Sequence, residues 1–299
     1  MRAISTVLDA ALFLLLVGAA VSTLALATSP PPAANDDAAD GVADTLTTSS
    51  ATVHYTLAPG ARHASSRVVE FPVTDGSTFQ RTAHGTLASH LAAAALGGLT
   101  VRGQRVSHAR ADYQRAVANA TRNLTRGRAH LAQIRARWEP YPDAPVEGTF
   151  RVGPTPPPAA TVHAETVVVA SGLPSAREPA RRVTRQSGTT ATFERVGAVV
   201  ARRIVRGLFP PNRTRSALLG DYPVEGLVTY RYERLGRYLR ANVTAQAVAD
   251  NATGANDRLT VALGERLAAD MRARFRSPGA AAEATSVGAV RITVRTWSP

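Results

Sequence analysis

The feature that most constrains this chain is an uncharged, strongly apolar segment close to its beginning. Residues Ala10 to Thr28 contain no charged side chain, and at the rise of an α-helix they span about 28 Å, close to the hydrocarbon thickness of a bilayer. The prolines at positions 30–32 cannot continue a helix. The sequence therefore predicts a single membrane-spanning helix over residues 1–28. The residues expected to anchor it are Leu12, Phe13, Leu14, Leu15, Leu16 and Val17.

Charges on the two sides of this segment predict its orientation. The N-terminal side carries Arg2, whereas the other side carries four acids, Asp36, Asp37, Asp40 and Asp44. Arginine and lysine near a membrane helix favour the cytoplasmic side. We therefore expect a single-pass protein of the cell membrane with a cytoplasmic N-terminus and an extracytoplasmic C-terminal region.

Glycosylation sequons favour the same location. Five asparagines stand in N-x-Thr sequons, where chance would give about one. These residues are Asn119, Asn123, Asn212, Asn242 and Asn251. The excess predicts N-glycosylation on the outer side of the membrane.

A cleaved secretory signal is the alternative interpretation of the N-terminus. Ala25-Leu26-Ala27 has the A-x-A form that signal peptidases cut, and cleavage would release a protein that begins near Thr28. The apolar run is longer than the 7–15 residues of an ordinary signal core, and only one arginine precedes it. Retention of the helix is therefore favoured.

Residues 2–8, RAISTVL, and the apolar run after them resemble the N-terminus of haloarchaeal type IV pilins and pilin-like proteins. The resemblance implies cleavage between Ala3 and Ile4 by a prepilin peptidase. It also implies that the helix acts as membrane anchor and as packing core of a filament. Two positions depart from the pattern, because Thr6 stands where those pilins often have proline and Asp9 where they commonly have glycine. Asp9 could lie at the membrane boundary or pair with the amine of a neighbouring subunit.

The whole chain also resembles an uncharacterised family of haloarchaeal membrane proteins. The segments that carry this resemblance are VHYTLAPG (53–60), GPTPPP (153–158), LFPP (208–211), GDYPV (220–224) and RITVRTWSP (291–299). The family implies a membrane topology and no activity.

Beyond the first helix we expect an α+β fold, since helical and strand patterns mix without a regular βαβ alternation. Residues 29–44 are rich in Pro, Ala and Asp and predict a disordered linker. A first α+β subdomain over 45–154 and a second over 161–299 are joined by a proline-rich connector, 155–160. Expected helices cover 86–96, 107–138, 193–208, 228–239 and 259–275, and expected strands cover 52–57, 67–73, 161–170 and 290–294.

Charge and cysteine usage narrow the possible partners. All 35 basic residues are arginine, and the net charge is +13, which favours lipid headgroups, acidic proteins or other anions. Nucleic acid is not expected, because no aromatic residues are interleaved with the basic stretches. The absence of cysteine excludes disulfides, thiolate metal sites and thiol catalysis.

The sequence shows no catalytic, cofactor or metal motif. The P-loop, the G-x-S-x-G elbow and H-E-x-x-H are missing, and the seven histidines include no pair at the spacings of metal ligands. Four acids could converge for acid–base chemistry, Glu165, Glu178, Glu225 and Glu233, but nothing separates them from solvated carboxylates. We therefore expect no enzyme, no cofactor and no identifiable small-molecule ligand.

Two functions remain. The leading hypothesis is a membrane-anchored structural or assembly component of a pilus-like or secretion apparatus, with membrane lipid and other envelope or pilus-like proteins as partners. The alternative is an anchored module that binds an anionic ligand or partner through an arginine-rich surface, to which Arg202, Arg203 and Arg206 would contribute.

Overall fold

The computed structural model describes residues 36–64, 69–126, 130–187, 191–220, 222–244 and 251–298. The predicted anchor, Leu12 to Val17, and the predicted processing site at Ala3 and Ile4 lie outside these residues.

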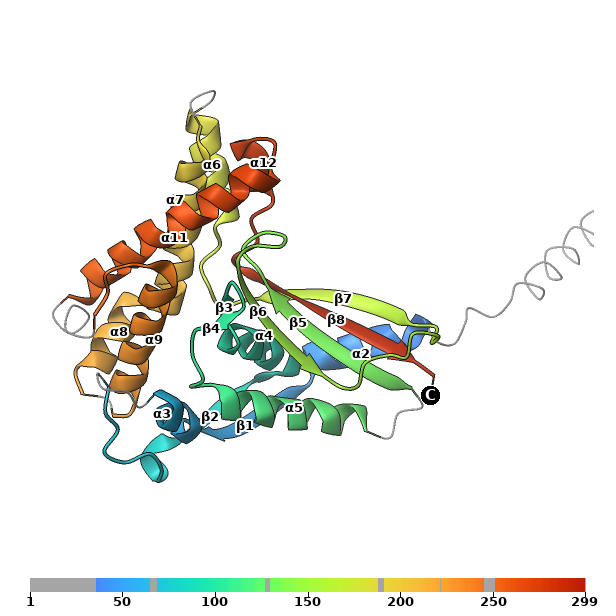
Figure 1. The fold of residues 1–299 in the computed structure, drawn as a ribbon. Helices are drawn as coiled ribbons and strands as arrows, with labels where there is room; N and C mark the ends of the chain where they lie inside the picture. Colours follow the sequence, from blue (N-terminus) through green and yellow to red (C-terminus); the bar gives the residue numbers. More distant parts are fainter. Residues whose placement is uncertain are drawn as a thin grey trace, which may run out of the picture.

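An antiparallel sheet organises the described residues (Figure 1). Its strand order is β4-β3-β6-β5-β8-β7. The strands are β3 (Thr100–Val101), β4 (Gln104–Arg105), β5 (Leu131–Trp138), β6 (Val146–Val152), β7 (His163–Ala170) and β8 (Ala289–Trp297). Strand β8 comes last in the chain, yet it pairs with β5 on one side and with β7 on the other. The sheet is therefore completed only when the end of the chain returns to it.

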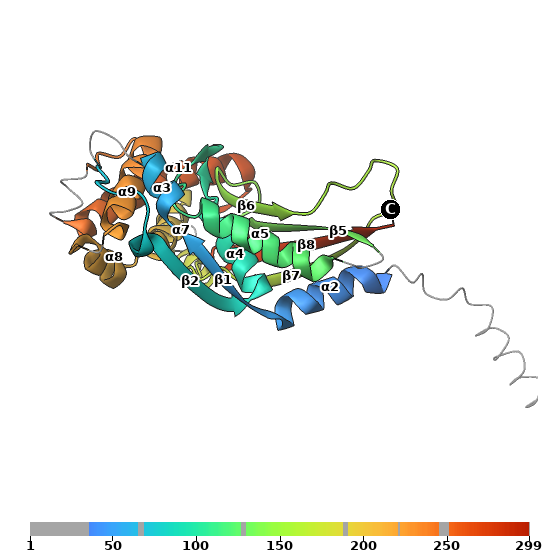
Figure 2. The same ribbon diagram turned by 90° about the horizontal axis from the view of Figure 1, so that it is seen from below.

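Side chains alternate across this sheet as the pleat requires. In β8, Val290, Ile292 and Val294 are buried, whereas Arg291 and Arg295 are exposed on the opposite face. The buried face packs against α2 (Asp36–Thr48) and α4 (Leu87–Gly97), and α5 (Ala111–Thr125) packs on α4 and β6 (Figures 1 and 2). A separate two-stranded ribbon of β1 (Ser50–Thr56) and β2 (Gln80–Thr86) lies against α5.

The remaining helices gather at one side of the sheet (Figure 1). They are α6 (Arg177–Ser187), α7 (Phe193–Leu208), α8 (Pro211–Leu218), α9 (Val224–Leu239), α11 (Ala252–Arg274) and α12 (Pro278–Glu283). The short α3 (Ala58–Ala64) packs on α9, and a 3₁₀ turn, η1 (Ser77–Phe79), precedes β2. Helices α7 and α11 approach closely at Gly197, where an added Cβ would lie 2.7 Å from the carbonyl oxygen of Gly264.

Hydrogen bonds from the end of β5 join the sheet to this helical part. Trp138 is fully buried, and its indole Nε1 donates to the carbonyl oxygen of Val287 at 2.8 Å, just before β8. The Tyr141 hydroxyl donates to a carboxylate oxygen of Asp270 in α11 at 3.0 Å. One continuous core includes residues from both sides of the predicted connector at 155–160. Buried side chains from the two expected subdomains, 45–154 and 161–299, therefore pack together in this core.

The fold class needs a correction. The mixture of helices and strands is α+β as expected, but the expected class included a membrane-spanning helix. Among the helices that the structure describes, none has both the length and the apolar character needed to cross a bilayer. Residues 1–28, where that helix was predicted, lie outside the described part of the chain.

Two local expectations were also wrong. Helix α2 begins inside the predicted linker 29–44, because Ala39, Val42, Ala43 and Leu46 recur at helical spacing and are buried against the sheet. The predicted helix 107–138 ends at Thr125, and its last part is strand β5. In β5 the arginines at 135 and 137 alternate with buried neighbours, a period of two that suits the pairing with β8.

Residues 67–73 were expected to form a strand. In the described part, 69–73, they form none, and Val69 and Phe71 instead pack in a small second core with Phe79 and Leu227.

Candidate functional site

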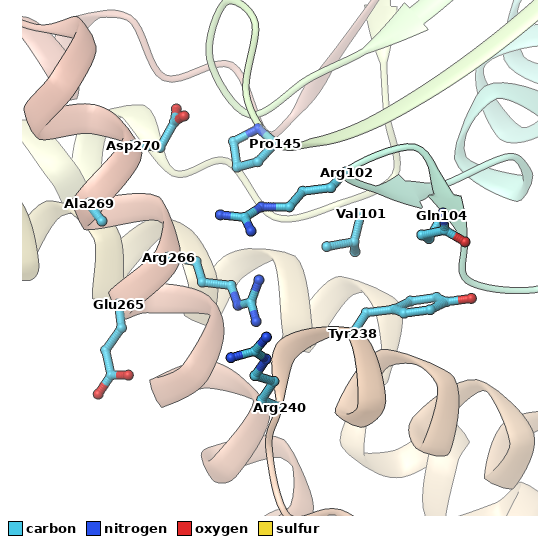
Figure 3. A pocket seen from close by; sticks show the side chains of 10 residues that line it. All are labelled: Val101, Arg102, Gln104, Pro145, Tyr238, Arg240, Glu265, Arg266, Ala269 and Asp270. Atoms are coloured by element: carbon cyan, nitrogen blue, oxygen red, sulfur yellow. The ribbon is translucent and has the colours of Figure 1, made fainter.

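Three arginines from three different elements meet in a cleft at the junction of the sheet and the helices. Figure 3 shows the guanidinium groups of Arg102, Arg240 and Arg266 pointing toward one another. The cleft has a volume of about 730 Å³. Its other lining residues are Val101, Gln104, Pro145, Tyr238, Glu265, Ala269 and Asp270.

Arg102 stands in the tight turn between β3 and β4. The two central residues of this turn, Arg102 and Gly103, have φ values of 48° and 76°. Positive φ at both positions is the requirement of a type I′ turn, which favours Asn-Gly and here contains Arg-Gly. The backbone N–H of Arg102 donates to the carbonyl oxygen of Pro145 at 2.7 Å, which fixes the turn against the start of β6.

Arg240 ends helix α9 in the left-handed conformation, with φ 57° and ψ 33°. Glycine usually takes this position, because a Cβ is unfavourable there. The helix is held beside the β3–β4 turn by Arg234 Nη2 and the Tyr238 hydroxyl, which donate to the carbonyl oxygen of Arg105 at 3.0 and 3.3 Å. These bonds bring Arg240 to the cleft that Arg102 enters from the sheet.

Backbone strain is concentrated at this site. Among the described residues other than glycine, three have φ in the left-handed region, namely Arg102, Asp143 and Arg240. Two of the three line the cleft. A left-handed conformation costs an ordinary residue about 1–2 kcal/mol, and such strain is typical of binding and catalytic sites.

Arg266 supplies the third charge from the middle of α11, where it is half-buried. Its pKa is lowered first by burial and then by the positive charges of Arg102 and Arg240. The part of this lowering that comes from Arg102 and Arg240 reflects repulsion between like charges.

Acidic side chains near the cleft do not neutralise these arginines. Glu265 is exposed, and its carboxylate points away from the three guanidinium groups in Figure 3. Asp270 accepts from Arg274 Nε at 2.8 Å and from the Tyr141 hydroxyl at 3.0 Å. No ion pair between described residues includes Arg102, Arg240 or Arg266. Arginine's planar fork binds carboxylate and phosphate oxygens in pairs, so the cleft is suited to an oxyanion.

Arg137 on the sheet shows the opposite arrangement. Its Nη2 lies 2.9 Å from Glu139, 3.4 Å from Asp143 and 3.6 Å from Glu147, which gives it carboxylate partners within the protein. The three arginines of the cleft therefore differ from Arg137, since no ion pair between described residues includes them.

The residues singled out from the sequence lie elsewhere. Arg202 and Arg206 are exposed on α7, Arg203 is half-buried there, and none of the three lines the cleft. All five sequon asparagines, Asn119, Asn123, Asn212, Asn242 and Asn251, are exposed, so their glycosylation stays a prediction.

The four candidate acids lie on three different elements. Glu165 is on β7, Glu178 on α6, and Glu225 and Glu233 on α9. The Glu178 carboxylate accepts from Arg185 Nη2 at 2.6 Å, which lowers its pKa. Among the described residues, no three acidic or histidine side chains are grouped so that they could hold a metal ion.

The three cleft arginines were not predicted from the sequence. Arg102-Gly103 carried a usable signal, since an X-Gly pair between two short β-prone segments predicts a hairpin turn. No sequence pattern links that turn to Arg240 and Arg266, because the three residues come together only in the folded chain.

The chain belongs to a family of unknown function, DUF7284, whose sequence model matches residues 8–297. Comparison with curated proteins and comparison with solved structures gave no match. The expected membership of an uncharacterised family is therefore confirmed.

The left-handed conformation of Arg240 predicts that replacing this residue with glycine stabilises the fold. In Arg240→Gly, the left-handed position becomes relaxed and one of three repelling charges is removed, so the free energy of unfolding should rise by about 1 kcal/mol. The matched control is Arg237→Gly on the same helix, which should lower it by about 0.5–1 kcal/mol, because there glycine replaces a helical residue. Urea unfolding measures both, and a loss of stability in Arg240→Gly would contradict the assigned strain.

The stability of the fold should depend on pH through the side chain of His108. Burial, followed by the nearby His63, Arg105 and Arg234, lowers the pKa of His108 from 6.5 to about 4, and the rings of His63 and His108 lie 3.7 Å apart. Between these two pKa values the unfolded chain binds a proton that the folded chain does not, so the stability of the fold decreases as the pH falls through this window.

His108→Gln removes this contribution. The urea midpoint of the variant should therefore fall less than that of the unmodified chain when the pH is lowered from about 7 to about 4.5. Carboxylates titrate alike in the variant and in the unmodified chain, so they do not affect the comparison. If the urea midpoints of the two proteins fell in parallel with pH, His108 would not have the lowered pKa.

Proposed function

We propose that this chain is a binding module for a small anion with several negative oxygens, such as a molecule with a diphosphate group. The observation that carries the proposal is the convergence of Arg102, Arg240 and Arg266, from separate elements, with no carboxylate partner among the described residues. Three like charges held together without an anion raise the free energy of the folded protein, and a bound oxyanion would remove that cost.

The size and lining of the cleft support a small-molecule ligand. Its volume of about 730 Å³ falls within the usual range of about 300–1,000 Å³ for ligand sites. The phosphoryl oxygens would lie among the three guanidinium groups, and the half-buried Tyr238 ring offers a surface for the rest of the molecule.

The charge of the whole chain supports the same proposal. A net charge of +13 attracts anions over a distance and raises their concentration near the cleft. Specificity then comes from the fixed geometry of the cleft, because charge alone attracts every anion.

The structural or assembly role stays a separate prediction. It comes from the resemblance of residues 2–8 to haloarchaeal pilin-like N-termini, and these residues lie outside the described part of the chain. The cleft arginines neither favour nor oppose that role.

Isothermal titration with inorganic pyrophosphate tests the binding proposal. The full-length chain should bind pyrophosphate saturably at low ionic strength, and the double variant Arg240→Gln/Arg266→Gln should bind at least about tenfold more weakly. This magnitude follows because a hydrogen bond to a charged group contributes about 1.5–3 kcal/mol.

The control for this titration is Arg202→Gln/Arg206→Gln. It removes the same charge from exposed positions of α7 that do not line the cleft, and its affinity should stay within about twofold of the unmodified chain. Equal losses of affinity in the two double variants would mean that pyrophosphate binding depends only on the net charge of the protein. That result, or no saturable binding, would contradict the proposal.

A further inference from the structure

A second cavity lies where the sheet layer meets the helices, beside the N-terminal half of α9. Its volume is about 340 Å³, and residues of β1, α4, the start of α5, α7 and α9 contribute to it. Its walls are mainly apolar and include Leu57, Leu96, Leu99, Leu173, Leu227 and Val228. No aspartate or glutamate lines this cavity.

Two arginines interrupt these apolar walls, Arg110 at the start of α5 and Arg231 on α9. Arg231 is half-buried, and its Nη1 donates to the carbonyl oxygen of Leu208 at 3.3 Å. Its Nε is buried and has no hydrogen-bond partner among the described residues. Its guanidinium carbon lies 5.4 Å from the centre of the Phe209 ring.

Arg231 is thus a half-buried cation with a buried, unpartnered Nε and with no counter-ion among the described residues. Burial, followed by the positive charge of Arg110, lowers its pKa to about 10. A buried charge is expensive unless it is paired, and an orphaned buried donor adds to the cost.

We propose that this cavity binds an apolar molecule with one carboxylate group, with the carboxylate beside Arg231 and Arg110 and the apolar part against the leucines of the wall. A neutral apolar molecule would leave the two guanidinium groups without an anion. A small inorganic anion would leave the apolar walls in contact with water. A monocarboxylic acid with an alkyl chain satisfies both parts of the cavity.

This site is distinct from the cleft of Arg102, Arg240 and Arg266. The two share no lining residue, and the cleft has several polar residues where this cavity has leucine and valine. A ligand of one site is therefore not expected to compete with a ligand of the other.

The test uses decanoate, 1-decanol and acetate as probes of the full-length chain, below the concentration at which decanoate forms micelles. Decanoate should bind at least about tenfold more tightly than 1-decanol, which has the same alkyl chain and no charge. Acetate, which has the same head and almost no chain, should show no saturable binding. Equal affinity for decanoate and decanol, or for decanoate and acetate, would overturn the proposal.

Variants then test whether decanoate binds in this cavity. Arg231→Gln should weaken decanoate binding at least about tenfold, whereas Arg237→Gln, an exposed change of the same charge on the same helix, should leave it within about twofold. If Arg231→Gln does not fold, as circular dichroism would show, Arg110→Gln takes its place and should weaken binding several-fold. Unchanged affinity in the folded variant would overturn the proposal.

The double variant Arg240→Gln/Arg266→Gln separates the two proposals. It should bind decanoate as the unmodified chain does while losing pyrophosphate. Loss of decanoate in that variant would place the acid in the cleft and contradict the second site, without affecting the evidence for the first.

Discussion

The position of strand β8 is the constraint on which the rest of the structure depends. β8 lies between β5 and β7, so the chain must return to the sheet after helices α6 to α12, which come between β7 and β8 in the sequence (Figure 1). The buried Trp138 and Tyr141 hold this return in place by donating to Val287 and Asp270. Both cavities lie at the resulting junction, and each takes arginines from the helical part and from segments beside the sheet. Neither site would exist in the sheet alone or in the helices alone.

Both sites contain arginines without a carboxylate partner among the described residues. The sites differ in the residues that surround these arginines. In the cleft, three guanidinium groups face a polar space, whereas in the apolar cavity Arg110 and Arg231 lie among leucines and valines. Some other arginines are paired with acids, as in the contacts of Arg137 with Glu139 and of Arg274 with Asp270. Free energies of unfolding are commonly only about 5–15 kcal/mol, so unpaired cations and left-handed arginines are significant costs. Anion binding gives a physical reason for their presence at both sites.

Local signals in the sequence predicted the elements whose packing is local. The expected helices 86–96 and 193–208 correspond to α4 and α7, and the expected helix 259–275 corresponds to the greater part of α11. The sequence did not predict β5, because its alternating arginines are informative only once β8 lies beside it. Helix α2 was not predicted, because its first residues belong to a segment rich in Pro, Ala and Asp, a composition typical of linkers. The helical spacing of Ala39, Val42 and Leu46 was nevertheless present in the sequence. The cleft could not be predicted at all, since Arg102, Arg240 and Arg266 are distant in the chain and meet only after the sheet is complete.

The central claim is that the three cleft arginines together hold an oxyanion, and anomalous diffraction tests it most directly. Crystals of the full-length chain soaked in selenate would be measured at the selenium edge, where the anion is distinguished from water. Because the described chain offers no acid partner to these guanidinium groups, we predict an anomalous peak within hydrogen-bonding distance of at least two of Arg102, Arg240 and Arg266. An empty cleft with the arginines turned apart, or paired with Glu265 or Asp270, would contradict the account.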